Sequence, residues 1–168
     1  MQIKKKQFKR LIAEIQQSVE WVDDLNCGGC GVFAAIVAKR FNKIGIPAVV
    51  RIGARNAPSN SNAVKDTYSQ YSRPKQSHFH SNGVSFDHLI VEIPFGGNIY
   101  HMDSICFHSA EPKTRTCSAP IYDGNLDVAT ALRIAKTKDW NRCFDRKQIP
   151  NLIKSVNNVF DSFVRNNK

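Results

Sequence analysis

Two cysteines and three glycines stand before a strongly apolar run in "NCGGCGVFAAIVAKRFNKIGIPAVV", residues 26–50. The pattern predicts that a helix starts near Cys30, so that this thiol lies in the first helical turn. Unpaired backbone N–H groups and the positive end of the helix dipole favour an anion there and lower the pKa of a thiol. Gly28 and Gly29 allow a tight turn, and the N–H of Cys30 is a candidate oxyanion donor. Cys30 is therefore a candidate nucleophile.

A cysteine nucleophile needs a base, and usually a third group that orients the base. The stretches "FDHLIVEI" and "NIYHMDSI" alternate as two strands of an antiparallel hairpin, connected by residues 94–97. His88 lies six residues before Pro94, and Asp103 lies six residues after Gly97. We therefore expect them to be near-opposite neighbours, with Cβ atoms ~4.5–5.5 Å apart. Asp103 would then accept a hydrogen bond from the far imidazole nitrogen and fix the tautomer of His88.

These residues carry a resemblance to a known family. The segment "GGCGVFAAIVAKRFNKIGIPAVV" resembles the nucleophile segment of the transglutaminase-like, papain-like cysteine enzymes, with Gly-x-Cys-x-Val-Phe-Ala at the helix start and Gly-Ile-Pro before a strand. The His88 strand and the "YHMDS" strand resemble that family's second and third catalytic elements, in the same chain order. The resemblance implies that Cys30 is the nucleophile, His88 the general base and Asp103 the orienting residue. It also implies attack on an amide to give a thioester, which water or an amine resolves.

The sequence departs from the family pattern at two points. Many of these enzymes take a second oxyanion donor from an upstream side chain, for which Gln17 and Trp21 are the candidates here. Gly31 fills the position where eukaryotic transglutaminases carry a Trp.

Hydrolysis, as in a cysteine protease or deamidase, is favoured over cross-linking because nothing marks an amine-acceptor site. The alternative is an inactive binding module of the same fold, and neither reading requires a cofactor.

The Cys-x-x-Cys pair Cys27 and Cys30 also allows a zinc or redox reading. A structural zinc site needs two more ligands, and the nearest pair is the His-Phe-His at residues 78–80. A redox pair lacks the expected βαβ context. We interpret Cys27 as a loop or packing thiol and expect no metal site. His101, two residues before Asp103, is a competing partner for that carboxylate.

Composition indicates a globular protein. The chain has 168 residues, of which 42% are hydrophobic, which predicts a single domain over residues 1–168. The longest uncharged apolar run, residues 31–38, is far shorter than the ~20 residues of a membrane span. Five irregularly spaced cysteines, with no signal-peptide pattern, predict reduced thiols and a cytoplasmic location. The net charge of +10 allows two interpretations. It either steers the protein toward an anionic partner, such as an acidic protein or nucleic acid, or reflects only a solvated basic surface.

Hydrophobic periodicity predicts the order of elements along the chain. The expected elements are helices at 5–23 and from about 30 to Gly45, a buried strand at 46–54, a polar loop at about 55–85, the two hairpin strands at 86–93 and 98–105, irregular chain at 106–125, and helices at 126–136 and 149–164. This order predicts an α+β fold with helices packed on one side of a small antiparallel sheet. A loop of that length is uncommon in a compact domain and is either a functional flap or disordered chain.

Overall fold

A computed structural model describes residues 3–25, 29–55, 85–104, 107–108, 121–126 and 144–167, with the backbone alone described in residues 52–55, 85–88, 107–108 and 121–126. Its elements are α1 (Lys5–Gln17), α2 (Cys30–Lys43), β1 (Val49–Arg55), β2 (Ser85–Phe95), β3 (Asn98–Met102), β4 (Phe107–His108), β5 (Ile121–Leu126), the 3-10 helix η3 (Arg146–Gln148) and α5 (Ile149–Asn166). The predicted helix at 126–136, beyond its first residue, and the predicted loop between Arg55 and Ser85 lie outside the described residues.

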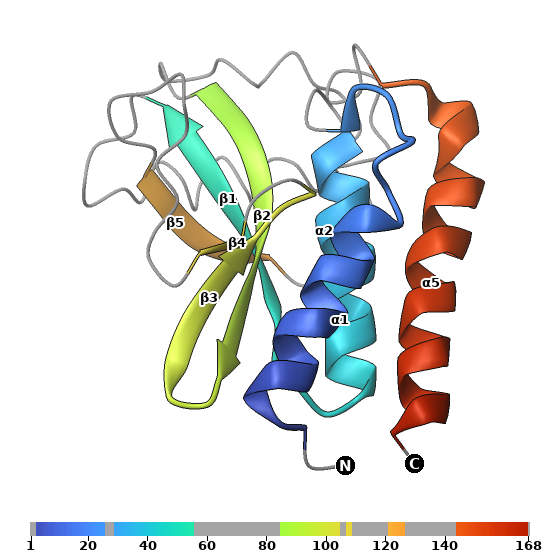
Figure 1. The fold of residues 1–168 in the computed structure, drawn as a ribbon. Helices are drawn as coiled ribbons and strands as arrows, with labels where there is room; N and C mark the ends of the chain where they lie inside the picture. Colours follow the sequence, from blue (N-terminus) through green and yellow to red (C-terminus); the bar gives the residue numbers. More distant parts are fainter. Residues whose placement is uncertain are drawn as a thin grey trace.

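The strands form one sheet in the order β4-β3-β2-β1-β5, and every neighbouring pair is antiparallel. The helices α1, α2 and α5 lie together on one side of this sheet (Figure 1). The predicted α+β arrangement is therefore present in the described residues. The prediction of irregular chain at 106–125 is wrong in part, because β4 and most of β5 fall within it. Both were missed because β4 has two residues and β5 reads "IYDGNL", with Asp, Gly and Asn, which strands usually avoid.

The first helix ends at Gln17, six residues before the predicted end. The hydroxyl of Ser18 donates a hydrogen bond of 2.7 Å to the carbonyl oxygen of Ile15, a contact by which serine competes with helical bonding. After it the chain turns more tightly, and the N–H of Val19 bonds to the carbonyl of Gln16, three residues back. Val19 is still buried. It fits the apolar period because it faces the core, although it lies in a turn and not in the helix.

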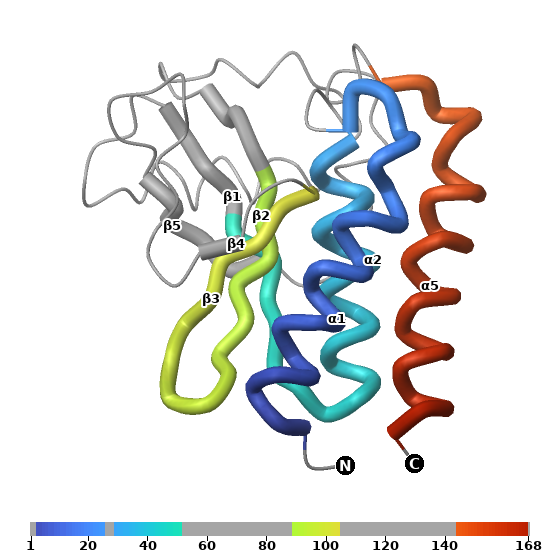
Figure 2. The backbone as a smooth tube through the Cα atoms, in the orientation of Figure 1, coloured from blue at the N-terminus to red at the C-terminus, as the bar shows by residue number. Residues whose placement is uncertain are grey.

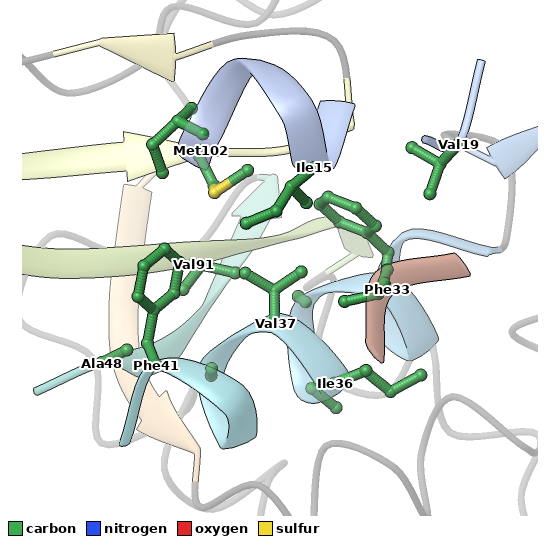
Figure 3. Packing of buried hydrophobic residues seen from close by; sticks show 14 of the residues in the cluster. Ile15, Val19, Phe33, Ile36, Val37, Phe41, Ala48, Val91 and Met102 are labelled. Atoms are coloured by element: carbon green, nitrogen blue, oxygen red, sulfur yellow. The ribbon is translucent and has the colours of Figure 1, made fainter. Parts of the chain in front are cut away.

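The second helix is the centre of the core. All nine residues of α2 from Cys30 to Ala38 are buried, and the helix contacts β1, β2 and α5. The apolar side chains of α1, α2, β2 and β3 meet in one cluster, where Figure 3 shows Ile15, Val37, Val91 and Met102. Because α2 is covered on several sides, its sequence is apolar around the helix, as the prediction required.

The end of α2 is fixed by local hydrogen bonds. Gly45 has a φ of +82°, the left-handed conformation expected of a glycine after a helix. Its N–H bonds to the carbonyl of Asn42, and the N–H of Ile46 bonds to that of Phe41. The side-chain amide of Asn42 also exchanges two hydrogen bonds, of 2.8 and 2.9 Å, with the backbone of Ala48. The helix end and the approach to β1 are therefore held together.

The hairpin of β2 and β3 has a two-residue turn. Both residues of the turn, 96–97, are glycines with positive φ, +59° and +77°, as type I′ turns require. The predicted four-residue connection is wrong, because Pro94 and Phe95 belong to β2 and pair with Ile99 and Asn98. Pro94 is tolerated because β2 pairs with β3 alone at this point, so its missing N–H removes no bond to β1.

Candidate active site

Cys30 is the first residue of α2, as predicted, with Gly29 at the N-cap. No acidic residue lies in the first turn, so no carboxylate opposes a thiolate there. Its side chain is 2% exposed and belongs to the hydrophobic core. The site therefore combines a helix start that favours an anion with burial that limits access to the Cys30 thiol.

The chain packs closely around the start of α2. A Cβ atom added at Gly29 would lie 2.8 Å from Leu25 Cδ1 and 2.8 Å from Phe144 Cδ2, closer than carbon atoms approach without displacement. Phe144, directly before η3, is itself buried. Gly29 therefore lies at a close approach of two apolar side chains, and a larger residue fits there only if those side chains move. Cys27 and Gly28 lie outside the described residues.

Asp103 follows the last residue of β3 and is half-buried. Its main-chain oxygen accepts a hydrogen bond of 3.2 Å from Nε2 of Gln16, in the last turn of α1. The last turn of α1 and the first turn of α2 lie at the same end of the helical layer (Figure 1). Asp103 is therefore held at the end of the molecule that carries Cys30. The sequence reading missed Gln16, although its position four residues after the buried Ile12 is a signal that it faces the protein.

The two-residue turn changes the predicted relation between His88 and Asp103. The β2–β3 ladder ends with Val91 paired to Met102. Continued one step beyond the ladder, the same register would place Ile90 beside Asp103 and would offset His88 and Asp103 by two residues. Such diagonal neighbours lie ~7–8 Å apart, against ~4.5–5.5 Å for a directly opposite pair. The two-residue turn therefore favours a diagonal relation over the near-opposite positions that were predicted, although neither residue is paired in this ladder.

The backbone at His88 lies beside an irregularity in the sheet. Gly53 of β1 pairs with His88, but the next residue, Ala54, pairs with Phe86. Asp87 is passed over, which is the pattern of a β-bulge. A bulge bends its strand and re-aims the side chains next to it, so the regular alternation of β2 ends at this point. The predicted contact between the imidazole of His88 and the Cys30 sulfur lies outside the described side chains.

His101 lies in a separate polar cluster. It pairs directly with Glu92 of β2, and its Nε2 lies 3.0 Å from Oε2 of that carboxylate. Arg51 Nη1 lies 3.6 Å from the same oxygen. His101 alternates with Tyr100 and Met102, which belong to the core under the helices, so the cluster lies on the opposite face of the sheet. The contact described for the His101 imidazole is with Glu92, and its predicted competition with His88 for the Asp103 carboxylate stays a prediction.

Neither predicted source of a second oxyanion donor is enclosed by the protein. Gln17 is exposed at the end of α1. Trp21 is 47% exposed, and its indole N–H donates a hydrogen bond of 2.9 Å to the carbonyl oxygen of Ser18. Gln16 is the half-buried amide at this helix end, and its Nε2 already bonds to Asp103. The backbone N–H of Cys30 stays the first candidate donor.

In the part of the chain that the structure describes, no three His, Cys, Asp or Glu residues are grouped to hold a metal ion. The helices described here include none that is long and apolar enough to span a membrane. Cys27 and the histidines at residues 78–80, on which the zinc interpretation rested, lie outside the described residues.

Comparison of the chain with protein-family models, curated proteins and solved structures gives no significant match.

Proposed function

We propose that this protein is a thiol-dependent amide hydrolase or acyltransferase with a transglutaminase-like, papain-like fold. In this proposal Cys30 is the nucleophile, His88 the general base and Asp103 the residue that orients the base. The observation that carries the proposal is the position of Cys30 at the first residue of a buried helix that packs on an antiparallel sheet. The strand β2 of that sheet contains His88, and β3 leads directly to Asp103.

Two further observations support this assignment. The hydrogen bond from Gln16 holds the backbone of Asp103 at the end of the helical layer where α2 begins. The register of β1 and β2 shifts next to His88, and bulges are frequent beside active sites because they re-aim a side chain. Both features concern the two residues that the reaction needs in addition to the thiol.

The proposed chemistry is acyl transfer to sulfur. The imidazole of His88 takes the thiol proton, and the thiolate of Cys30 attacks the carbonyl carbon of an amide. The oxyanion accepts a hydrogen bond from the Cys30 N–H. When the C–N bond breaks, the imidazolium gives its proton to the leaving amine, and a thioester remains on Cys30. Water, or a second amine, then attacks the thioester and restores the thiol. The proposed substrate is an amide of a peptide or protein.

The alternative function is an inactive binding module of the same fold. The observation in its favour is the 2% exposure of Cys30, because a thiol enclosed by apolar side chains is usually unreactive. The two proposals differ in the reactivity of one sulfur atom, which a chemical probe measures without knowledge of the substrate.

The test is the rate of alkylation by iodoacetamide at neutral pH, followed for each cysteine by peptide mapping. If the enzyme proposal holds, Cys30 reacts faster than Cys106, and His88→Ala removes the difference while the fold is kept. Asp103→Asn leaves a residual enhancement through a misoriented His88. If Cys30 reacts no faster than Cys106, the binding module is favoured. If His88→Ala leaves Cys30 fully reactive, His88 is not the base.

A further inference from the structure

Three helix ends meet at the end of the molecule that lies away from Cys30. The first turn of α1 and the last turns of α2 and α5 lie there together (Figure 2). Phe41 of α2 contacts both Phe8 of α1 and Phe160 of α5, with ring centroids 6.0 and 5.0 Å apart. The side chains of Gln7 and Asn167 also form a hydrogen bond between α1 and the residue after α5. These contacts fix the three ends relative to one another.

Exposed basic side chains are concentrated on these turns and next to them. We use the name basic end for the set Lys4, Lys5, Lys6, Lys9, Lys39, Lys43 and Arg165, all of which are exposed. The segments 4–10, 39–45 and 162–167 contain no Asp or Glu. Among the described residues, none of the seven forms an ion pair. The basic end therefore carries a high density of charge that the described parts of the protein do not neutralise.

Part of this charge opposes the folding of α1. Lys4 is the N-cap residue, and Lys5 and Lys6 follow it in the first turn, which contains no acidic residue. The positive end of the helix dipole disfavours cations at those positions. Residues that conflict with their local structure are expected at functional or strained sites. An anionic ligand would remove the conflict.

We propose that the basic end binds the phosphate backbone of nucleic acid, without sequence preference. Seven cations spread over three helix ends fit an extended polyanion better than a small anion, which needs converging donors. Lysine is depleted in protein–protein interfaces, whose centres are apolar, but lysine is a standard contact to phosphate. The large apolar residues of α1 are all in the core, so this helix offers no large apolar face to a protein partner or to a membrane interface.

This proposal does not depend on the catalytic one, because the basic end and Cys30 lie at different ends of the helical layer. It holds equally for an enzyme and for an inactive module. The contact is electrostatic, so it releases counterions and weakens with salt in proportion to the number of phosphates contacted. This dependence distinguishes phosphate contacts from an apolar docking surface.

The test is the fluorescence anisotropy of a labelled duplex DNA of mixed sequence, titrated with the protein at several NaCl concentrations. The double variant Lys5→Glu/Lys9→Glu is compared with Lys147→Glu/Lys154→Glu, which removes the same charge near the other end of α5. We expect the first variant to bind roughly fivefold or more weakly and to lower the slope of log K against log salt by about two, at ~0.9 for each phosphate contact. The control should keep the wild-type slope.

Three results would overturn the proposal. Equal weakening in the two variants would show that net charge alone drives binding. Absence of wild-type binding at low salt would show that nucleic acid is not a ligand. Tighter binding to phosphatidylserine vesicles or to a polyglutamate peptide than to DNA would assign the basic end to a membrane or an acidic protein. Circular dichroism of each variant verifies that the fold is unchanged.

Discussion

The side-chain amide of Gln16 donates a hydrogen bond of 3.2 Å to the main-chain oxygen of Asp103, a residue 87 positions further along the chain. This bond joins the last turn of α1 to the chain directly after β3. In the proposed mechanism it makes Gln16 a positioning residue, because it restrains the backbone of the residue that orients His88. The bond would act through Asp103 and not on the substrate.

Substitution of Gln16 tests this relationship. We expect Gln16→Ala to lower the free energy of unfolding by about 1 kcal/mol, because a partly buried hydrogen bond is lost, and to slow alkylation of Cys30. Gln17→Ala is the matched control, since the neighbouring glutamine is exposed and should change neither quantity. Urea denaturation and the alkylation rate are the measurements. Equal effects of the two substitutions would show that the bond has no special role.

The close packing of Leu25 and Phe144 around Gly29 gives a second prediction. We expect Gly29→Ala to destabilise the protein by ~1–3 kcal/mol, because its Cβ would press against Leu25 and Phe144 and overpack the core. It should also change the alkylation rate of Cys30, the next residue. Gly45→Ala is the control. It costs ~1–2 kcal/mol through its positive φ alone, with no atom within 4 Å of the new Cβ, and should leave Cys30 reactivity unchanged. Thermal unfolding and peptide mapping decide between these outcomes.

The cluster of Arg51, Glu92 and His101 gives a prediction about stability alone. Glu92→Gln should cost about 1–3 kcal/mol, because it weakens charged contacts to two largely buried partners. The same change in the exposed Arg10–Glu14 pair, Glu14→Gln, should cost less than about 0.5 kcal/mol. Alkylation of Cys30 should be the same in Glu92→Gln as in the wild type, since the cluster lies on the other face of the sheet. A slower reaction would contradict that separation.

Asn42 connects the end of α2 to the approach to β1 through two hydrogen bonds with Ala48. We expect Asn42→Ala to lower the free energy of unfolding by about 1–3 kcal/mol, because both backbone groups of Ala48 lose a partner. Asn98→Ala removes an exposed bond to the Gly96 carbonyl and should have almost no effect. Chemical denaturation of both variants measures the difference. A similar loss in both would show that the helix end is held by the glycine cap alone.

Local signals in the sequence predicted several elements well. The glycines before Cys30 and at residue 45 marked the two ends of α2, because helix caps depend on a few neighbouring residues. The apolar face of α5, with Leu152, Val156, Phe160 and Phe163, was read from its periodicity and is buried. The end of α1 was placed too late because periodicity continues through the turns after Gln17, where apolar positions still face the core.

The sequence by itself determined which residue types stand at the start of α2 and on the two hairpin strands, and therefore the candidate chemistry. Only the tertiary structure decided how those positions relate. The two glycines of the hairpin set a register that, continued beyond Met102, favours a diagonal position of Asp103 relative to His88 over an opposite one. The bond from Gln16 placed Asp103 at the end of the helical layer that begins with Cys30. Both depend on contacts between chain segments far apart in sequence, because register and packing arise from pairing partners that a local pattern does not specify.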